Sequence, residues 1–269
     1  MHSTNPQTGT TPVVLSIGGH DATGGAGIQA DIETTLAHQC RACTLVSCLT
    51  TQDTHNVHHL YPQPVDTLLE QLHTLLGDIA PTIIKIGLLG SAELIQAMAP
   101  LLSTFNTPLV LDPILAAGGG YPLADSALIH ALVSQFVPQT TLLTPNRAEA
   151  LRLSGQTDLF SAMHYLLDRG CQHILLTSTD ATQGRQVINT LYSQDGSVQD
   201  YTWPRLPHRY HGSGCTLATA CACQIAQGMA LPDAVQAAQA FTWHSLQQAE
   251  RPGQGQYLPN RRHPTHRLR

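Results

Sequence analysis

Apolar runs of strand length alternate with segments of helical periodicity along most of the chain. The strand-like runs cover residues 12–18, 43–50, 82–89, 108–111, 140–144 and 173–177. Apolar residues at i, i+3 and i+4 predict helices over 26–38, 65–77, 92–102, 124–136 and 159–169. Because the strand segments are continuously apolar, they predict a parallel sheet that is covered on both faces. The pattern indicates an α/β protein with a doubly wound, three-layer α/β/α architecture.

The pattern of apolar and polar positions changes near the C-terminal end of the chain. Segments 186–192 and 198–203 predict a small β-hairpin, and helices are expected over 214–228 and 231–250. No repeat or linker divides the chain, so residues 12–250 are expected to form a single domain.

Both ends of the chain are polar. Residues 1–11 predict a disordered N-terminal segment. After Arg251 the composition shifts to Pro, Gln, Arg and His, which predicts a loosely docked polar tail over residues 251–269.

Composition and charge exclude several classes of protein. Of the 269 residues, 42% are hydrophobic and 12% are charged, which argues against a charge-driven disordered chain or a coiled coil. A formal net charge of −5 argues against a nucleic-acid partner. The longest apolar run, residues 82–89, is far shorter than the ~20 residues of a membrane-spanning helix. Since residues 1–11 carry no secretion signal, a cytoplasmic protein is expected.

The seven cysteines and fifteen histidines show neither a disulfide framework nor a metal-ligand pattern. Cys40 and Cys43 have the spacing of a CxxC pair, but no second pair or nearby histidine pair accompanies them. They are expected to be reduced core residues.

A glycine-rich stretch, residues 18–27, joins the first predicted strand to the first predicted helix. Glycine allows close approach of the backbone to a ligand, so this stretch favours a small-molecule pocket over a plain turn. It matches neither the dinucleotide-binding pattern nor a P-loop. Asp31, in the helix that follows, is expected to point its carboxylate back into the pocket.

A second glycine-rich stretch, residues 211–216, precedes a strongly apolar helix. Free N–H groups at a helix start, together with the helix dipole, favour a phosphoryl-binding site formed by Gly212, Ser213 and Gly214. The same field favours the thiolate form of Cys215. The alternative is that Cys215 is a small buried residue. A third glycine-rich stretch, residues 116–121, is a candidate ligand-covering loop.

Asn146 and Glu149 fall one turn apart at a predicted helix start. A carboxylate and an amide suit a hydrated Mg²⁺ that also binds substrate phosphates. A helix cap by Asn146 with Glu149 at the third helical position explains the same pair, and both interpretations hold together.

At this point the chain resembles a known family. The matching motifs are Gly19, GGAGIQAD (24–31), LTTQDT (49–54), KIGLLGS (85–91), Asp112-Pro113, TPNRAEA (144–150) and HGSGCT (211–216). Together they resemble hydroxymethylpyrimidine and phosphomethylpyrimidine kinases of thiamine biosynthesis, in the ribokinase-like superfamily. The resemblance covers about residues 12–250. Most ribokinase relatives have Asp where this subgroup has Cys215.

The resemblance implies a fold, a site and a set of ligands. The implied fold is ribokinase-like, with a central mostly parallel sheet. Gly19, Asp31 and Gln52 are implied in pyrimidine binding, since an amide offers the donor and the acceptor that an aminopyrimidine edge needs. ATP is the implied phosphoryl donor. Its phosphates and Mg²⁺ are implied to contact the remaining candidates, which are Asn146, Thr177, Thr216, the metal ligands Glu149 and Asp112, and residues 212–215, with Cys215 as the catalytic base.

The chain departs from the family pattern at two lysines. Thr177 stands where the family commonly has lysine at a strand end, and glycine replaces a second lysine near Gly118. Lys85 is the only lysine of the chain and lies inside an apolar strand. Mg²⁺, backbone N–H groups, or an arginine such as Arg147 or Arg185 must therefore balance the charge of the ATP phosphates.

These observations predict a kinase of 4-amino-5-hydroxymethyl-2-methylpyrimidine and of its monophosphate, expected as a homodimer. Two alternatives stay open. One is a pyridoxal kinase, because pyridoxal is a similar flat heterocycle with a hydroxymethyl group. The other is a non-catalytic pyrimidine-binding regulatory protein, although retention of Cys215, Glu149 and the glycine-rich helix start argues against it.

Overall fold

The computed structural model describes residues 11–177 and 184–262. The predicted N-terminal segment, apart from Thr11, and the end of the predicted tail lie outside the described residues. So do Ser178, Thr179 and Asp180, which follow the strand end that carries Thr177.

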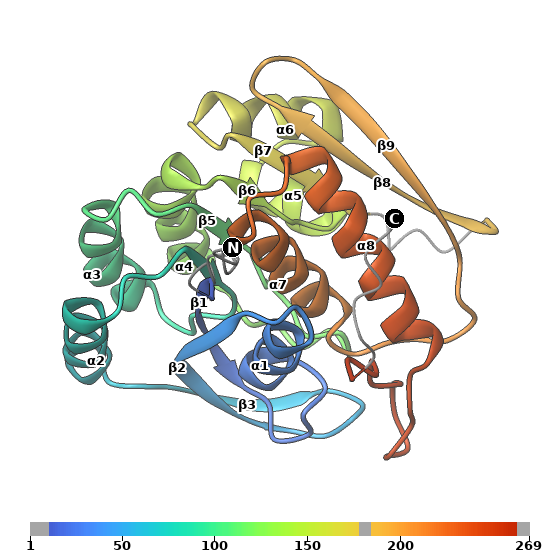
Figure 1. Ribbon diagram of the computed structural model, residues 1–269, viewed down its shortest axis with the longest axis horizontal. Coiled ribbons are helices and arrows are strands. Elements are labelled where there is room, and N and C mark those ends of the chain that lie inside the picture. Colours follow the sequence, from blue (N-terminus) through green and yellow to red (C-terminus); the bar gives the residue numbers. More distant parts are fainter. Residues whose placement is uncertain (1–10, 178–183, 263–269) are drawn as a thin grey trace, which may run out of the picture.

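A nine-stranded sheet runs through the described part of the chain in the order β3-β2-β1-β4-β5-β6-β7-β8-β9 (Figure 1). The strands are β1 (Val13–His20), β2 (Arg41–Gln52), β3 (Val57–Pro62), β4 (Ile83–Ile86), β5 (Leu109–Leu111), β6 (Leu142–Leu143), β7 (His173–Leu176), β8 (Gln186–Ser193) and β9 (Val198–Pro204). Neighbours from β2 to β7 are parallel, whereas β3, β8 and β9 pair antiparallel. The mostly parallel sheet and the added hairpin are confirmed, and β3 is an element that the pattern missed.

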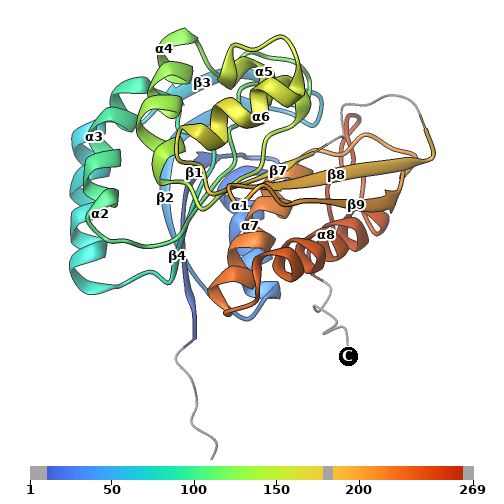
Figure 2. The same ribbon diagram turned by 90° about the horizontal axis from the view of Figure 1, so that it is seen from above.

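Helices cover both faces of the sheet (Figure 2). One face carries α1 (Gly27–Ala37), α7 (Ser213–Ala226) and α8 (Leu231–Gln247). The other carries α2 (Val65–Asp78), α3 (Ala92–Ser103), α4 (Ser126–Ala131), α5 (Arg147–Ser154) and α6 (Leu159–Asp168). A π-helical turn over Leu132–Phe136 and a 3-10 turn over Val137–Gln139 extend α4. In the described residues, no helix is both long and apolar enough to cross a membrane.

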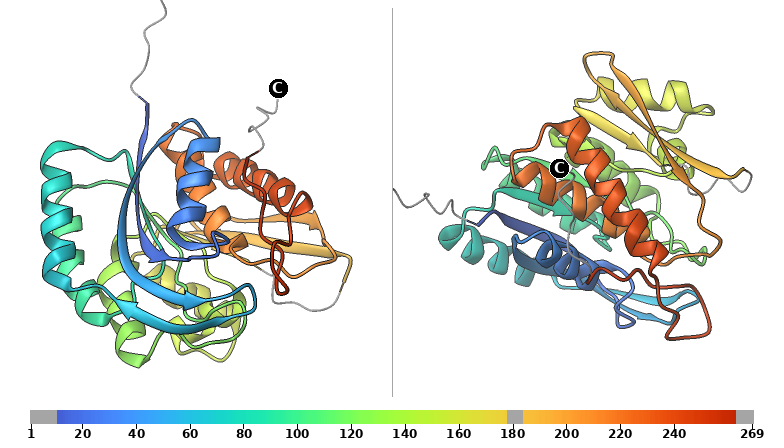
Figure 3. Two further views of the ribbon diagram at one scale, coloured as in Figure 1. Left: turned by 90° about the horizontal axis from the view of Figure 1, so that it is seen from below. Right: turned by 45° about the vertical axis from the view of Figure 1, so that its right-hand side comes forward.

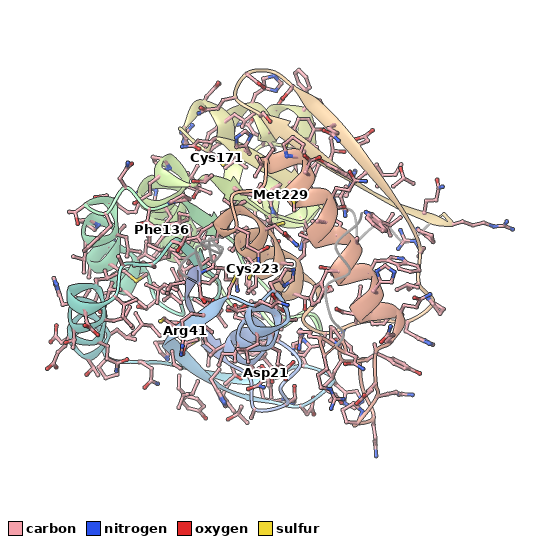
Figure 4. The ribbon with its side chains drawn as sticks, viewed as in Figure 1. Asp21, Arg41, Phe136, Cys171, Cys223 and Met229 are labelled. Carbon is pink, nitrogen blue, oxygen red and sulfur yellow. The ribbon has the colours of Figure 1, made fainter. Side chains whose placement is uncertain are left out.

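Alternate residues of each central strand enter two separate cores. Leu15 and Ile17 of β1 pack with the cluster under α2 to α6, whereas Val14 packs with the cluster under α7 and α8. Phe136 and Cys223, both labelled in Figure 4, belong to the first and second cluster respectively. Both faces of a strand are therefore buried, which is the physical reason for its continuously apolar sequence.

Residues 250–262, hereafter the C-terminal segment, fold back onto the body of the protein (Figure 3). Glu250 pairs with Leu258, and Tyr257 pairs with Tyr210. Arg261 is only 2% exposed. The expectation of a loosely docked tail from residue 251 is wrong as far as residue 262, because composition did not reveal that this arginine has buried partners.

Candidate active site

A cavity of about 210 Å³ opens at the carboxyl ends of the parallel strands. Its walls come from the ends of β1 and β2, the loops after β5, β6 and β7, and the start of α7. Ligands bind at this edge in open α/β sheets, because the connections that leave the strands there surround a common crevice.

All but two of the sequence-predicted site residues line this cavity. Those present are Gly19, Gln52, Asp112, Asn146, Glu149, Thr177, Gly212, Ser213, Gly214 and Cys215. Asp31 and Thr216 are absent from the lining. The structure thus brings together residues that are nearly two hundred positions apart, while their individual roles stay predictions.

Asp31 is a buried counterion and does not point into the cavity. Its two carboxylate oxygens accept hydrogen bonds from Lys85 Nζ at 2.9 and 3.0 Å, and Thr219 Oγ1 donates to it at 2.6 Å. A buried ammonium needs such a partner, since an unpaired charge in the core is very costly. Although burial opposes it, the charge of Asp31 raises the pKa of Lys85. The expectation that Asp31 reaches the pocket is therefore wrong.

Thr216 also faces away from the cavity. Its hydroxyl donates to the carbonyl of Gly212 at 2.8 Å and accepts from Arg261 Nε at 2.8 Å. Both hydrogen bonds of the Thr216 hydroxyl are made inside the protein. The expectation that Thr216 contacts phosphate is therefore wrong for its hydroxyl. It supports the turn that leads into α7.

Residues 211–215, hereafter the anion loop, open helix α7. Gly212 caps the helix with φ of 81°, and a Cβ there would overlap the carbonyl oxygen of Gly25. Only glycine tolerates both the left-handed backbone and this close approach. The first N–H groups of a helix have no partner within the helix, so the N–H groups at the start of α7 form a potential anion site at the cavity wall.

Cys215 lies in the first turn of α7 and is 6% exposed. Burial raises the pKa of its thiol to about 12, and the nearby charge of Lys85 only partly opposes that rise. Desolvation at this depth therefore favours the neutral thiol in the free protein, contrary to the sequence-based expectation of a thiolate.

Asp112 follows β5 at the floor of the cavity. Within the described residues its Oδ2 is a buried oxygen without a hydrogen-bond partner. Burial raises the pKa of Asp112 to about 6, with Lys85 opposing and Asp31 adding to the rise. An orphaned carboxylate oxygen on a cavity wall that also holds the Glu149 carboxylate suits a hard divalent cation such as Mg²⁺.

Asn146 and Glu149 form the capping box that the sequence suggested. Asn146 Oδ1 accepts from the N–H of Glu149 at 2.9 Å, and Glu149 Oε2 accepts from the N–H of Asn146 at 2.9 Å. Thr177 pairs with Asn146 in a parallel bridge and lines the cavity with it. Arg147 and Arg185, the candidate substitutes for lysine, are exposed and do not line the cavity.

Sequence reasoning missed a close contact between Asp21 and His211. Asp21 Oδ2 lies 2.7 Å from His211 Nε2, which also contacts the side-chain amide of Gln52 at 3.2 Å. Burial opposes ionisation of Asp21, but its hydrogen bonds with His211 and Thr23 lower its pKa overall. Asp21 is labelled in Figure 4. It is the one carboxylate in the glycine-rich stretch of residues 18–27, and this was the sequence signal that could have marked it as a site residue.

The same aspartate organises residues 21–27, hereafter the glycine loop. Its two oxygens accept hydrogen bonds from the N–H groups of Thr23 and Ala26, both at 2.8 Å. A side chain at Gly25 would collide with the ring of His211, so the glycine loop and the anion loop pack directly against each other. The abundance of glycine is thus explained by loop-to-loop packing as well as by the cavity.

Comparison with known proteins identifies the family. The model of the phosphomethylpyrimidine kinase family matches residues 21–260. The chain belongs to this family. It is 34% identical over 239 residues to the hydroxymethylpyrimidine/phosphomethylpyrimidine kinase of Streptomyces coelicolor, covering 86% of this chain and 87% of that protein. It is also 34% identical to the Synechococcus elongatus protein of the same name, covering 91% of this chain and 95% of that protein.

Solved structures agree with the fold. The pyridoxal kinase of Staphylococcus aureus in complex with AMP-PCP and pyridoxal superposes with a TM-score of 0.85 at 26% identity, covering 94% of each chain. A phosphomethylpyrimidine kinase from Clostridium difficile gives 0.75 at 25% identity, covering 87% of this chain and 98% of that one. The ribokinase-like fold expected from the motifs is confirmed, and the protein is a kinase of this family, that is, a phosphotransferase.

Proposed function

We propose that this kinase transfers the γ-phosphoryl group of ATP to the hydroxymethyl group of 4-amino-5-hydroxymethyl-2-methylpyrimidine, and then to the resulting monophosphate. The observation that carries the proposal is the contact between Gln52 and His211, 3.2 Å apart. His211 is the first residue of the anion loop. An amide able to bind a heterocycle edge therefore lies directly beside a site able to bind a phosphoryl group.

Gln52 lines the cavity, and its side-chain amide carries both donor and acceptor groups, which is the pattern that an aminopyrimidine edge requires. Apolar side chains of Val57, Leu88 and Leu123 line the same cavity and provide surfaces for a flat ring. Gly19 has a further reason to be glycine, since a Cβ there would lie 2.9 Å from Cys48 Sγ.

The phosphate end of the cavity is formed by the anion loop together with Asn146 and Thr177. Asp112 and Glu149 would hold Mg²⁺. When bound, Mg²⁺ would neutralise phosphate charge and offset the repulsion between Asp112 and a thiolate at Cys215. Backbone N–H groups from the start of α7 would stabilise charge on the transferring group.

Cys215 is the proposed base for the alcohol acceptor. Because burial raises the pKa of its thiol in the free protein, this role requires that pKa to fall when the ligands bind. The positive charge of Lys85 already acts in this direction. The monophosphate acceptor needs no base, because its second pKa is near 6 and an anionic oxygen is present at neutral pH.

Turnover assays test this assignment. The protein is incubated with Mg-ATP and separately with the hydroxymethylpyrimidine, its monophosphate and pyridoxal, while ADP and phosphorylated product are followed. We expect Mg²⁺-dependent product with both pyrimidines. Turnover with pyridoxal alone would show a pyridoxal kinase, and tight pyrimidine binding without turnover would show a regulatory binding protein.

We further expect a cytoplasmic homodimer. Light scattering checks the oligomeric state, and cell fractionation checks the localisation.

A further inference from the structure

Arg261 is a buried guanidinium in the C-terminal segment, immediately after the last residue that the family model matches. Its Nε donates to Thr216 Oγ1 at 2.8 Å, and its Nη2 donates to the carbonyl of Gly25. Its Nη1 donates to Glu33 Oε2 at 3.0 Å, with a longer contact of 3.5 Å to the carbonyl of Gly24. A guanidinium is buried without large cost only when its donors are satisfied in this way.

These contacts connect the two loops that meet at the cavity. Thr216, which accepts from Arg261, donates its own proton to the carbonyl of Gly212. Gly25, the second acceptor, supplies the carbonyl oxygen against which Gly212 packs so closely that no Cβ fits. One side chain thus contacts both sides of the junction between the glycine loop and the anion loop.

The rest of the C-terminal segment supports the same junction. The N–H of His211 donates to the carbonyl of Tyr257 at 2.9 Å. A side chain at Gly25 would also collide with Leu258. Tyr257, Leu258 and Arg261 therefore pack against both loops without lining the cavity wall themselves.

We propose that Arg261 is a positioning residue for phosphoryl transfer, holding the N–H groups at the start of α7 in place through Gly25, Thr216 and Gly212. The inference rests on the proposed phosphoryl transfer at the anion loop, but not on the identity of the acceptor. Donors that are fixed before reaction act mainly on the transition state, so Arg261 affects kcat more than KM.

The test compares Arg261→Met with Arg262→Met. Arg262 is the matched control, because its side chain is 75% exposed and bonds only the exposed Glu250 among the described residues. We expect Arg261→Met to lower kcat ~10–100-fold in both phosphorylation steps, as misplacement of about 1 Å can do. The KM values for ATP and acceptor should change less than ~3-fold, as expected for a loss confined to the transition state. Arg262→Met should match the unchanged protein.

Chemical rescue separates positioning from folding. Arg261→Ala leaves a cavity of guanidinium shape, so added guanidinium ion, below denaturing concentrations, should raise its kcat and leave that of Arg262→Ala unchanged. Arg261→Lys should not restore kcat, since an ammonium cannot reach acceptors on both loops as a planar fork does. Unchanged kcat in folded Arg261→Met, or no response of Arg261→Ala to guanidinium, would overturn the proposal. All variants are assayed with whichever acceptor the unchanged protein phosphorylates. An error in the proposed acceptor would therefore appear in the assays of the unchanged protein and would not affect the comparison between Arg261 and Arg262 variants.

Discussion

The two halves of the cavity are held in place by different kinds of interaction. Around the glycine loop and the anion loop, two ion pairs and one aspartate–histidine contact involve buried side chains: Asp31 with Lys85, Glu33 with Arg261, and Asp21 with His211. Asn146, Glu149 and Thr177, on the ATP side beyond the anion loop, are held by a capping box and a backbone bridge. No lysine or arginine among the described residues lines the cavity itself.

This difference shows where the charge of the protein is used. Each buried pair joins segments that are far apart in sequence, including α1 to β4 and the glycine loop to the anion loop. The charges therefore fix backbone geometry rather than contact phosphate directly. Charge stabilisation at the proposed ATP site would then depend on backbone N–H groups and on a cation held by Asp112 and Glu149.

The largest expected effect is at Cys215, between the two halves. Cys215→Ala should slow phosphorylation of the alcohol by the ~10²–10⁴-fold typical of lost general-base catalysis. Phosphorylation of the monophosphate should slow much less, because its acceptor oxygen is already anionic. Single-turnover rates with each acceptor measure the two losses.

Cys221→Ala, a buried thiol on the same helix outside the cavity, is the control for packing. Equal losses in both steps of Cys215→Ala would assign Cys215 to loop geometry. Partial recovery of the alcohol step in Cys215→Asp would support the role as base.

Gly212 tests whether the anion loop serves both steps. Gly212→Ala should lower both rates by ~10²–10³-fold, the loss expected when a backbone donor is displaced. Gly228→Ala is a matched control: its φ is also 81°, but a Cβ there meets nothing within 4 Å. Both substitutions carry the left-handed strain of about 1–2 kcal/mol, whereas the overlap with Gly25 and the place on the cavity wall are found at Gly212 and not at Gly228. Loss of one step alone in Gly212→Ala would contradict a shared site.

The sequence predicted the layers and the edge that carries the site. Continuous apolar strands predicted the parallel sheet because both faces of β1, β4 and β5 are buried, and glycine-rich strand ends predicted where ligands approach. The antiparallel strand β3 was missed because it is an edge strand. Its sequence, Val57–Pro62, is largely exposed and carries two histidines and a proline, so it has no buried apolar pattern.

The missed parts of the site depend on contacts between distant residues. Asp31 was assigned to the pocket since nothing local shows that Lys85, on β4, needs a counterion. The thiolate form of Cys215 was predicted from its place at a helix start. How deeply the thiol is buried depends on the packing of α7 against β1, β4 and β5, which the local sequence does not show. Arg261 lay in a stretch whose composition resembles a tail, and its buried partners are more than 40 positions away.

Asp112 tests the charge of the ATP half through pH. Its pKa of about 6 lies above the ordinary value of 3.8, so the folded state binds more protons than the unfolded state between these values. Stability should therefore fall as pH rises from about 4 to about 6, by roughly 2–3 kcal/mol. Asp112→Asn should remove this fall and be more stable at pH 7, while losing Mg²⁺-dependent turnover.

Chemical denaturation between pH 4 and pH 8 measures the effect on stability. Asp78→Asn, at an exposed carboxylate on α2, should keep the pH dependence of the unchanged protein. If the stability of Asp112→Asn depends on pH in the same way as that of the unchanged protein, the pKa of Asp112 is not raised in the folded state.

The smallest expected effect concerns recognition of the heterocycle by Gln52. Its amide is held between Thr50 Oγ1 at 2.9 Å and His211 Nε2, whose other contact is Asp21. Gln52→Leu keeps a similar volume but leaves the polar edge of the pyrimidine unpaired. Acceptor binding should weaken by ~1–3 kcal/mol while ATP affinity stays nearly unchanged, as calorimetry with each ligand can measure.

Two further variants locate the cause of that loss in the acceptor half. Gln199→Leu, on the exposed face of β9, controls for the substitution itself. Asp21→Asn keeps the shape of the side chain that contacts His211 but removes its negative charge, which orients the His211 ring. This variant should weaken pyrimidine binding less than Gln52→Leu does. It should also lower kcat. If Gln52→Leu lowered ATP affinity as much as pyrimidine affinity, the division of the cavity into an acceptor half and an ATP half would be wrong, because one amide would then serve both ligands.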